Sequence, residues 1–270
     1  MVRMRLLQRV AIGMIILIGT CIGAEAKTVT YVGSSTIGNL LNEAKEPFKA
    51  KTGIDLLIDI SSESAGGEAA AIVGSADLGG VARDLRPETL AHGVICHVIG
   101  RDAIAVIVNH KNPIKALSRD QIKAIFTGRI TNWEALGWMN RNIVALITAE
   151  QSATRQVFQK VMLNGEAYRN VVSPSVDRLV PEWVAGDEDA IGQISFSFIA
   201  NNPMIRAISI DRLTSTVTNP RYPIASPLYL CTKGEPTGNA RRLIDWILSP
   251  EGQDLVKKSF LPMPMVRSRE

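Results

Sequence analysis

The stretch TVTYVGSSTIGNLLNEAKEPFKA, residues 28–50, contains the local pattern that decides the fold. Its first part, residues 28–32, is typical of a short β-strand, and the small residues GSST at 33–36 then favour a turn. After the turn, apolar side chains recur at the spacing of one helix face, at Leu40, Leu41, Ala44 and Phe48. A strand, a small-residue turn and a helix in this order form the building unit of α/β proteins.

The same unit returns twice along the chain. Residues 54–60 predict a second strand, which leads through a turn at 61–67 into an alanine-rich helix, and residues 143–147 lead into a helix that begins at Ser152. Further strands are predicted over residues 77–82, 94–99, 104–108, 190–198, 205–210 and 226–232. Strands that alternate with helices favour mainly parallel sheets flanked by helices, so we expect an α/β fold.

The N-terminus has the three parts of a secretory signal peptide. Three arginines within the first nine residues precede an apolar run at 10–22, and AEA at 24–26 supplies a small-residue cleavage motif. The run is shorter than the roughly 20 residues that a membrane-spanning helix needs, so we expect cleavage near Lys27 and export to the periplasm. Removal of residues 1–26 halves the formal net charge of +4. No run of Lys and Arg with interleaved aromatic residues remains, which argues against nucleic-acid binding.

Two cysteines, Cys96 and Cys231, lie in strand-like apolar segments of the mature chain. An oxidising periplasm permits a disulfide between them, but a spacing this long gives no geometry, and two separately buried thiols are the favoured alternative. His92 and His97 lie close to Cys96, yet no second group of metal ligands accompanies them. We therefore expect no metal and no cofactor.

Three turns rich in Ser, Thr and Gly lie between a strand and a helix, at 34–36, 61–67 and 152–154. The first N–H groups of a helix have no partner within the helix, and its dipole favours negative charge there, so such turns can bind an anion. Arg83 follows the third strand and Arg155 lies in the first turn of its helix, where a guanidinium could pair with an oxyanion. The same hydroxyls could instead cap helices, and both arginines could be surface residues.

Motifs of common enzyme classes are absent from the sequence. It contains no G-x-S-x-G elbow, no Walker loop, no G-x-G-x-x-G and no His-Glu-x-x-His. The three histidines all lie between residues 92 and 110, and none adjoins a plausible nucleophile. We therefore expect a binding protein with no catalytic residues.

The most specific segment is LSRDQIKAIFTGRITNW, residues 117–133, which begins with a capping box formed by Ser118 and Gln121. This segment, GSSTI at 33–37 and AIG at 190–192 resemble the phosphate-binding proteins of ABC-type phosphate importers, which belong to the type II periplasmic-binding-protein superfamily. The resemblance extends over nearly the whole mature chain.

The resemblance implies a two-lobed fold whose lobes are joined by two crossing strands. Residues 27–108 with 224–270 would form lobe 1, and residues 109–223 would form lobe 2. Such a protein is expected to work as a monomer, to close on phosphate between its lobes, and to pass it to the membrane permease of an ABC importer. Two alternatives stay open: a receptor for another oxyanion, or an envelope protein that uses this fold for signalling or adhesion.

The resemblance also implies a set of ligand-binding residues, namely Ser35, Thr36, Ile37, Ser64, Arg83, Ser152, Ala153, Thr154 and Arg155. Ala153 and Gln151 stand where the family has glycines, Thr148 where it has a phosphate-contacting arginine, and Ala82 where it has Asp or Ser. These departures remove a charge and a hydrogen-bonding side chain. A proton on the ligand needs an acceptor, for which the candidates are Glu63, Asp84 and Glu150.

Overall fold

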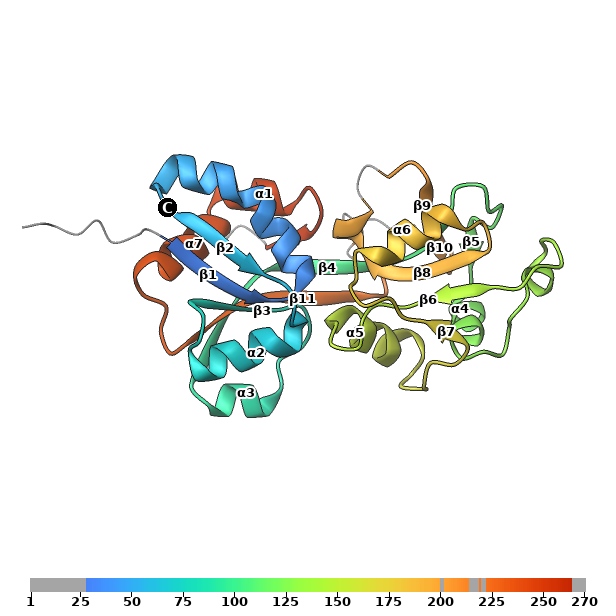
Figure 1. Ribbon diagram of the computed structural model, residues 1–270, viewed down its shortest axis with the longest axis horizontal. Coiled ribbons are helices and arrows are strands. Elements are labelled where there is room, and N and C mark those ends of the chain that lie inside the picture. The colour runs from blue at the N-terminus through green and yellow to red at the C-terminus, as the bar shows by residue number, and fades with distance from the viewer. Residues whose placement is uncertain (1–27, 200–201, 214–218, 220–221, 264–270) are drawn as a thin grey trace, which may run out of the picture.

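The protein has two lobes that lie side by side (Figure 1). The computed structural model describes residues 28–199, 202–213, 219 and 222–263. The predicted signal peptide, residues 1–26, lies outside the described residues. In the described part of the chain, every helix is too short or too polar to cross a membrane.

The first lobe is built around five strands in the order β2-β1-β3-β11-β4. Strand β1 pairs in parallel with β2 and β3, whereas β11 runs antiparallel to both β3 and β4. The bounds of its elements are β1 Thr28–Gly33, α1 Ser35–Thr52, β2 Asp55–Asp59, α2 Glu63–Val73, β3 Leu78–Val81, α3 Pro87–Ala91, β4 Val94–Asn109, β11 Ala225–Lys233, α7 Gly238–Leu248, α8 Pro250–Val256 and β12 Leu261–Pro262.

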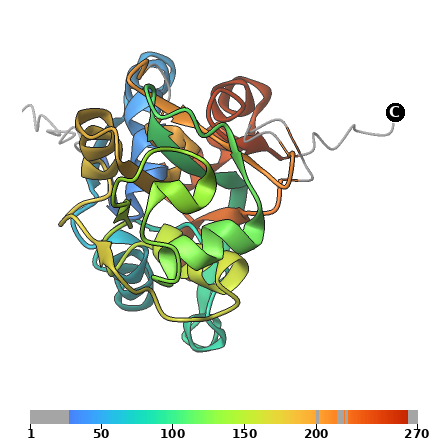
Figure 2. The same ribbon diagram turned by 90° about the vertical axis from the view of Figure 1, so that its right-hand side faces the viewer.

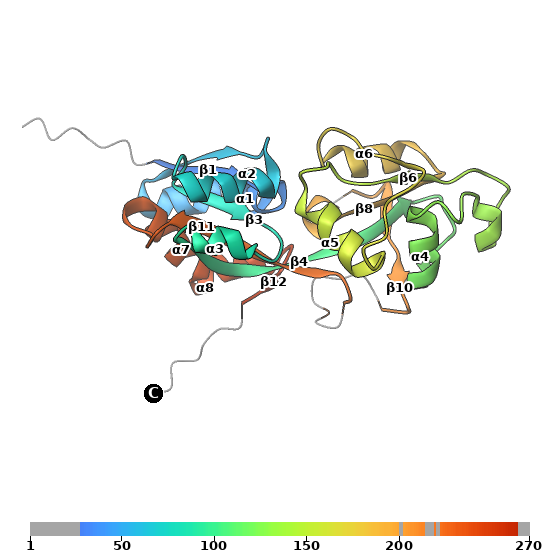
Figure 3. The same cartoon turned by 90° about the horizontal axis from the view of Figure 1, so that it is seen from below.

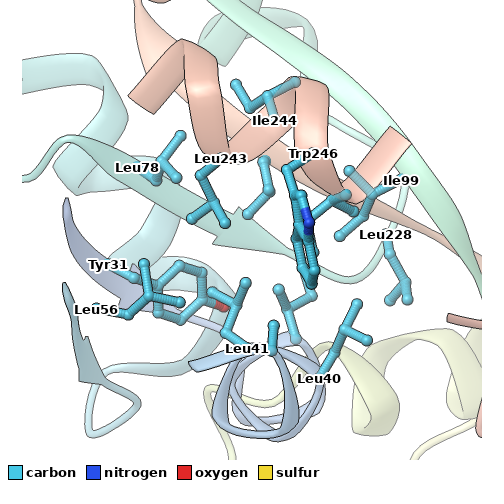
Figure 4. Packing of buried hydrophobic residues seen from close by; sticks show 14 of the residues in the cluster. Tyr31, Leu40, Leu41, Leu56, Leu78, Ile99, Leu228, Leu243, Ile244 and Trp246 are labelled. Atoms are coloured by element: carbon cyan, nitrogen blue, oxygen red, sulfur yellow. The ribbon is translucent and has the colours of Figure 1, made fainter. Parts of the chain in front are cut away.

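Helices α1, α7 and α8 cover one face of this sheet, and α2 covers the other. Figure 4 shows the larger core, in which Leu40 and Leu41 of α1 pack in one cluster with Trp246 of α7 and the strand residues Leu56 and Leu228. These α1 residues belong to the apolar face predicted from the sequence, so burial of that face fixes α1 on the sheet. Its N-terminus then lies at the carboxyl end of β1.

The second lobe contains a sheet of β4, β8, β6 and β7, in which β6 pairs in parallel with both neighbours. Helices α4 and α5 pack on one face and α6 on the other (Figure 2). The bounds of its elements are β5 Ala116–Leu117, α4 Arg119–Phe126, a 3₁₀ helix Trp133–Leu136, β6 Val144–Leu146, α5 Ala153–Met162, β7 Val171–Val172, α6 Leu179–Gly186, β8 Ala190–Ser195, a 3₁₀ helix Phe196–Phe198, β9 Ile205–Ala207 and β10 Ser209–Ile210.

Strand β4 belongs to both lobes. It pairs with β11 up to Ala103, and with β8 and β9 from Ile104 to Asn109. Figure 3 shows β4 passing from one lobe to the other beside β11. The change of partner lies between Ala103 and Ile104, inside the range 27–108 that the sequence assigned to lobe 1.

The predicted α/β class and most predicted elements are confirmed. The capping box is present: the Ser118 Oγ accepts from Gln121 N at 3.1 Å, and the Gln121 Oε1 accepts from Ser118 N at 2.8 Å. Several predictions were wrong in detail, and the strand expected over residues 205–210 is two short strands, β9 and β10, which pair with β4 and β5. Segments 94–99 and 104–108 form one continuous strand, and the strand expected over 190–198 ends at Ser195, whose Oγ accepts from Ser197 N and starts a 3₁₀ helix.

The structure also decides between the two alternatives for the cysteines. Cys96 and Cys231 are directly opposite each other on β4 and β11, with their Cα atoms 4.0 Å apart, and form a disulfide. Cys231 is fully buried. The bond joins the two crossing strands within the first lobe.

Candidate functional site

A cavity of about 480 Å³ lies where the two lobes meet. From the first lobe it is lined by Ser35, Asn39, Ile58, Asp59, Ile60, Ser61 and Glu63, and from the second lobe by Val176, Asp177, Arg178 and Phe198. The carboxyl end of β2 and the N-termini of α1 and α2 form one wall. The segment before α6 and the end of the second 3₁₀ helix form the other.

The first predicted turn delivers the N-terminus of α1 to this cavity. Gly33 has φ of +143°, and a Cβ there would lie 2.4 Å from the Gly80 carbonyl oxygen, so the turn requires glycine. The Ser34 N–H donates to that same carbonyl at 3.0 Å. Ser35 and Thr36, the first residues of α1, are buried, and Ser35 lines the cavity.

Glu63 bonds directly to this helix start. Its Oε2 accepts a hydrogen bond from the Ser35 backbone N–H at 3.0 Å. Glu63 is buried and has φ of 52°, a left-handed conformation that costs energy in a non-glycine residue and is often found at binding sites. The Ser35 Oγ is buried and makes no hydrogen bond of good geometry, although it is near enough to Glu63 to influence that carboxyl's pKa.

The second predicted turn gives α2, which begins at Glu63 rather than after Gly67 as expected. Ser64 is fully buried, and its Oγ accepts a hydrogen bond from the Ala82 N–H at 3.1 Å. This bond ties the start of α2 to the end of β3. Ser64 therefore lies at the same end of the first-lobe sheet as Ser35.

The third predicted turn forms the N-terminus of α5 in the second lobe. Ser152, Ala153 and Thr154 are all buried, and Ala153 packs with the core cluster of the first lobe. The Ser152 Oγ donates to the Asp177 Oδ2 at 2.5 Å, and the Ala149 N–H donates to the Asp177 Oδ1 at 2.9 Å. Asp177 thus connects the N-terminus of α5 to the cavity between the lobes.

The two arginines singled out from the sequence make other contacts in this structure. Arg83 is buried and forms two hydrogen bonds with Glu68, from Nη1 at 3.1 Å and Nη2 at 2.5 Å. Arg155 is half-buried, with its guanidinium 5.6 Å from the centre of the Tyr168 ring. Neither arginine lines the cavity.

Thr148, Asp84 and Glu150 lie outside the cavity lining. Thr148 is fully buried, and its Oγ1 accepts from the Gln193 Nε2 at 2.8 Å. Asp84 is exposed and pairs with Lys160 across the lobes at 3.1 Å, and Glu150 is exposed. Of the three candidate proton acceptors, Glu63 alone lines the cavity.

Burial raises the pKa values of both cavity carboxyls, and the Asp177 charge raises that of Glu63 further. The pKa of Glu63 rises to about 7, first because of burial and second because of the Asp177 charge. Burial raises the pKa of Asp177 to about 6 despite the bonds from Ser152 and Ala149. One carboxyl from each lobe lines the same cavity, and both have raised pKa values.

Sequence reasoning missed Asp177, Arg178, Asn39 and Phe198. Asp177 and Arg178 precede α6, a helix that was not predicted, and nothing in the local pattern around them resembles an anion-binding turn. Asn39 and Phe198 extend the site toward the crossing strands. The Asn39 Nδ2 donates to the Ser197 Oγ at 3.4 Å, and the latter hydroxyl contacts the Ser195 Oγ at 3.0 Å.

Comparisons with known proteins agree with this architecture. The family model described as "PBP superfamily domain" matches residues 22–251. Phosphate-binding protein PstS of Bacillus subtilis is 28% identical over 246 residues, covering 87% of this chain and 81% of that protein. A putative phosphate ABC transporter substrate-binding protein with bound phosphate, from Clostridium perfringens, is 33% identical with a TM-score of 0.81, covering 87% of this chain and 98% of that chain.

A second solved structure, an ABC-type phosphate transport receptor from Vibrio cholerae, has a TM-score of 0.69 at 20% identity, which shows a shared fold. The aligned region covers 88% of this chain and 100% of the Vibrio cholerae chain. These matches confirm the resemblance inferred from residues 117–133 and the two-lobed fold it implied. The chain belongs to the PBP superfamily.

Proposed function

We propose that this chain is an exported solute-binding protein that captures inorganic phosphate between its lobes and delivers it to the membrane permease of an ABC importer. The observation that carries the proposal is a cavity between the lobes that Ser35 lines at the N-terminus of α1, and that Asp177, bonded to Ser152 at the N-terminus of α5, lines from the other lobe. Relatives named for phosphate binding, one of them with bound phosphate, support the choice of ligand.

The ligand contacts would come from N–H and hydroxyl donors. We propose Ser35, Thr36, the Ile37 N–H and Ser64 on the first lobe, and Ser152, the Ala153 N–H and Thr154 on the second. Each side chain in this set is buried, so an oxyanion bound there would be dehydrated and held by donors that have lost water. Arg83, which is paired with Glu68, and Arg155, which lies beside the Tyr168 ring, would not touch the ligand.

Movement of the lobes would occur where β4 changes partners. We propose that the first lobe moves against the second as a monomeric clamp, hinged at β4 and β11. Asp102, on β4, accepts from the Ser195 Oγ at 2.8 Å and so lies at this junction. Ser195 connects through Ser197 to Asn39 in the cavity wall, which gives the junction a contact with the site.

Phosphate should stabilise the mature chain, residues 27–270, and serine at position 152 should be needed for this effect. At 100 times its dissociation constant, phosphate is expected to add about 2.7 kcal/mol to the free energy of unfolding. Ser152→Ala should weaken binding roughly 10-fold or more, because a hydrogen bond to a charged group contributes about 1.5–3 kcal/mol. Isothermal titration calorimetry and thermal unfolding at pH 6 would measure both effects.

Ser175→Ala is the matched control, because Ser175 is an exposed serine in the segment before α6. It should bind phosphate like the unchanged protein. Sulfate, molybdate and arsenate in the same assay separate a phosphate receptor from a receptor for another oxyanion. An absence of stabilisation by all four anions would contradict the proposal and favour a signalling or adhesion role in the envelope.

A further inference from the structure

Two carboxylates occupy donors that an oxyanion would use. The Glu63 carboxylate accepts the N–H of Ser35 at the start of α1. The Asp177 carboxylate accepts hydrogen bonds from the hydroxyl of Ser152, the N-cap of α5, and from the Ala149 N–H in the loop before it. The donors at both helix starts are therefore partly satisfied by negative groups of the protein itself.

The charges around this pair do not neutralise it. Among the described residues, neither Glu63 nor Asp177 forms an ion pair. Asp59 also lines the cavity and adds negative charge, and Arg178 lines it with its side chain 65% exposed and its guanidinium directed to Glu182 at 3.4 Å.

The ionisable groups near Glu63 do not offset the negative charge of the two carboxylates either. Tyr31 is near enough to feel the Glu63 charge: its pKa is raised well above its usual range, first by burial and then by that charge. On α2, Glu68 holds both Arg83 and Arg86, so those cations are already paired. An arriving anion would therefore add to a local excess of negative charge.

We infer that anion capture in this cavity is linked to proton uptake, with Glu63 and Asp177 as the groups that take up the proton. This inference rests on the proposed function of the same cavity. Protonation removes the repulsion between the two carboxyls and the ligand, and it turns a carboxyl oxygen from an acceptor into an O–H donor. The Ser35 hydroxyl, buried and without a well-aligned partner, supplies a further donor beside them.

The direction of the pH effect follows from the two carboxyls. Their pKa values, about 7 for Glu63 and about 6 for Asp177, lie above those of exposed carboxyls, and a bound anion would raise them further. Affinity should therefore be highest at pH 5–6 and should fall above pH 7. The fall is expected to be about tenfold per pH unit for each proton linked to binding.

Calorimetry can count the protons directly. The mature chain would be titrated with inorganic phosphate at pH 5.5, 6, 7, 7.5 and 8, each in two buffers of different ionisation enthalpy. Uptake of close to one proton is expected near pH 7.5, and less at pH 5.5, where the carboxyls already carry protons. Because sulfate keeps the same charge across this range, a sulfate titration reports only protons bound by the protein, whereas phosphate can bring or lose its own.

Two substitutions assign the proton to the pair. In Glu63→Gln and in Asp177→Asn the amide oxygen can still accept the N–H bonds, but the side chain no longer titrates. Both variants should take up fewer protons and should lose less affinity than the unchanged protein between pH 6 and 8. Glu150→Gln is the control: it removes the same charge from an exposed residue just before α5 and should leave proton uptake unchanged.

The outcomes separate this inference from the proposed function. Phosphate binding without proton uptake and with flat affinity from pH 6 to 8 would overturn the inference while leaving phosphate capture intact. Equal proton uptake in both variants and the unchanged protein would also overturn it. Failure of phosphate to bind at every pH would instead refute the proposed function. If one variant does not fold, the other still decides, because the ligand's own protons contribute equally in the variant and in the unchanged protein.

Discussion

Glu68→Ala should lower the free energy of unfolding by about 3–5 kcal/mol, because it leaves the buried Arg83 guanidinium without its partner. The Glu68 side chain is fully buried and the Arg83 side chain is 8% exposed. The Glu68 Oε1 also accepts from the Thr89 Oγ1 at 2.9 Å, and Arg86 pairs with the other carboxylate oxygen. Removal of the carboxylate therefore breaks several charge-assisted bonds at once. Urea unfolding at pH 7 measures the loss.

The pH dependence of stability gives a second measurement on the same group. Burial alone would raise the pKa of Glu68, but hydrogen bonds from Arg83, Arg86 and Thr89 outweigh it and lower the pKa to about 2. A carboxyl with a lowered pKa stabilises the fold above its unfolded pKa of about 4.3, and this contribution is lost as the pH falls toward 2. The unchanged protein should lose this contribution between pH 4.5 and 2, and Glu68→Ala should not.

A double variant serves as the control. Arg83→Leu with Glu68→Leu removes both buried charges, and such replacements are often neutral or stabilising. We expect it to recover most of the stability lost in Glu68→Ala and to keep phosphate binding, since Arg83 does not line the cavity. Loss of phosphate binding in the stable double variant would show that Arg83 contacts the ligand after all. A loss below 1 kcal/mol in Glu68→Ala would contradict the structural role.

Much of the fold could be predicted because its elements carry local signals. The apolar face of α1 and the capping box of α4 are short-range patterns, and the structure reproduces both. The continuity of β4 was harder to see, because Gly100, Arg101 and Asp102 interrupt its apolar residues. Pairing with β11, which is far away in sequence, holds that segment extended. Helix α6 was missed because Pro181 lies within it.

The candidate site was predictable only where donors come from a turn. The serines at 35 and 152 were found because a small-residue turn before a helix is visible in one segment. Asp177 was missed because its importance comes from a hydrogen bond to Ser152, which is 25 residues away in sequence. Arg83 was predicted to contact the ligand because the sequence shows its charge but does not show that the buried Glu68 already pairs with it.

Reduction of the Cys96–Cys231 disulfide should lower the free energy of unfolding by about 4 kcal/mol, near the upper end for native disulfides. The two cysteines are 135 residues apart, and the loop between them contains the whole second lobe. In the chain-entropy view, a bond that closes so long a loop acts mainly by restricting the unfolded chain. Urea unfolding with and without reductant measures the loss. A variant with both cysteines changed to Ala should have the stability of the reduced protein, and reductant should not change it.

The same bond should leave phosphate affinity nearly unchanged. Ala103 is seven positions after Cys96 on β4, a distance of about 23 Å along an extended strand, so the disulfide lies well away from the junction of the lobes. The register of β4 with β11 runs from Val94 to Ala103 on both sides of the disulfide and can hold the strands together without it. If reduction changed phosphate affinity severalfold while stability barely moved, the bond would be controlling the motion of the lobes through the crossing strands, and its purely structural role would be refuted.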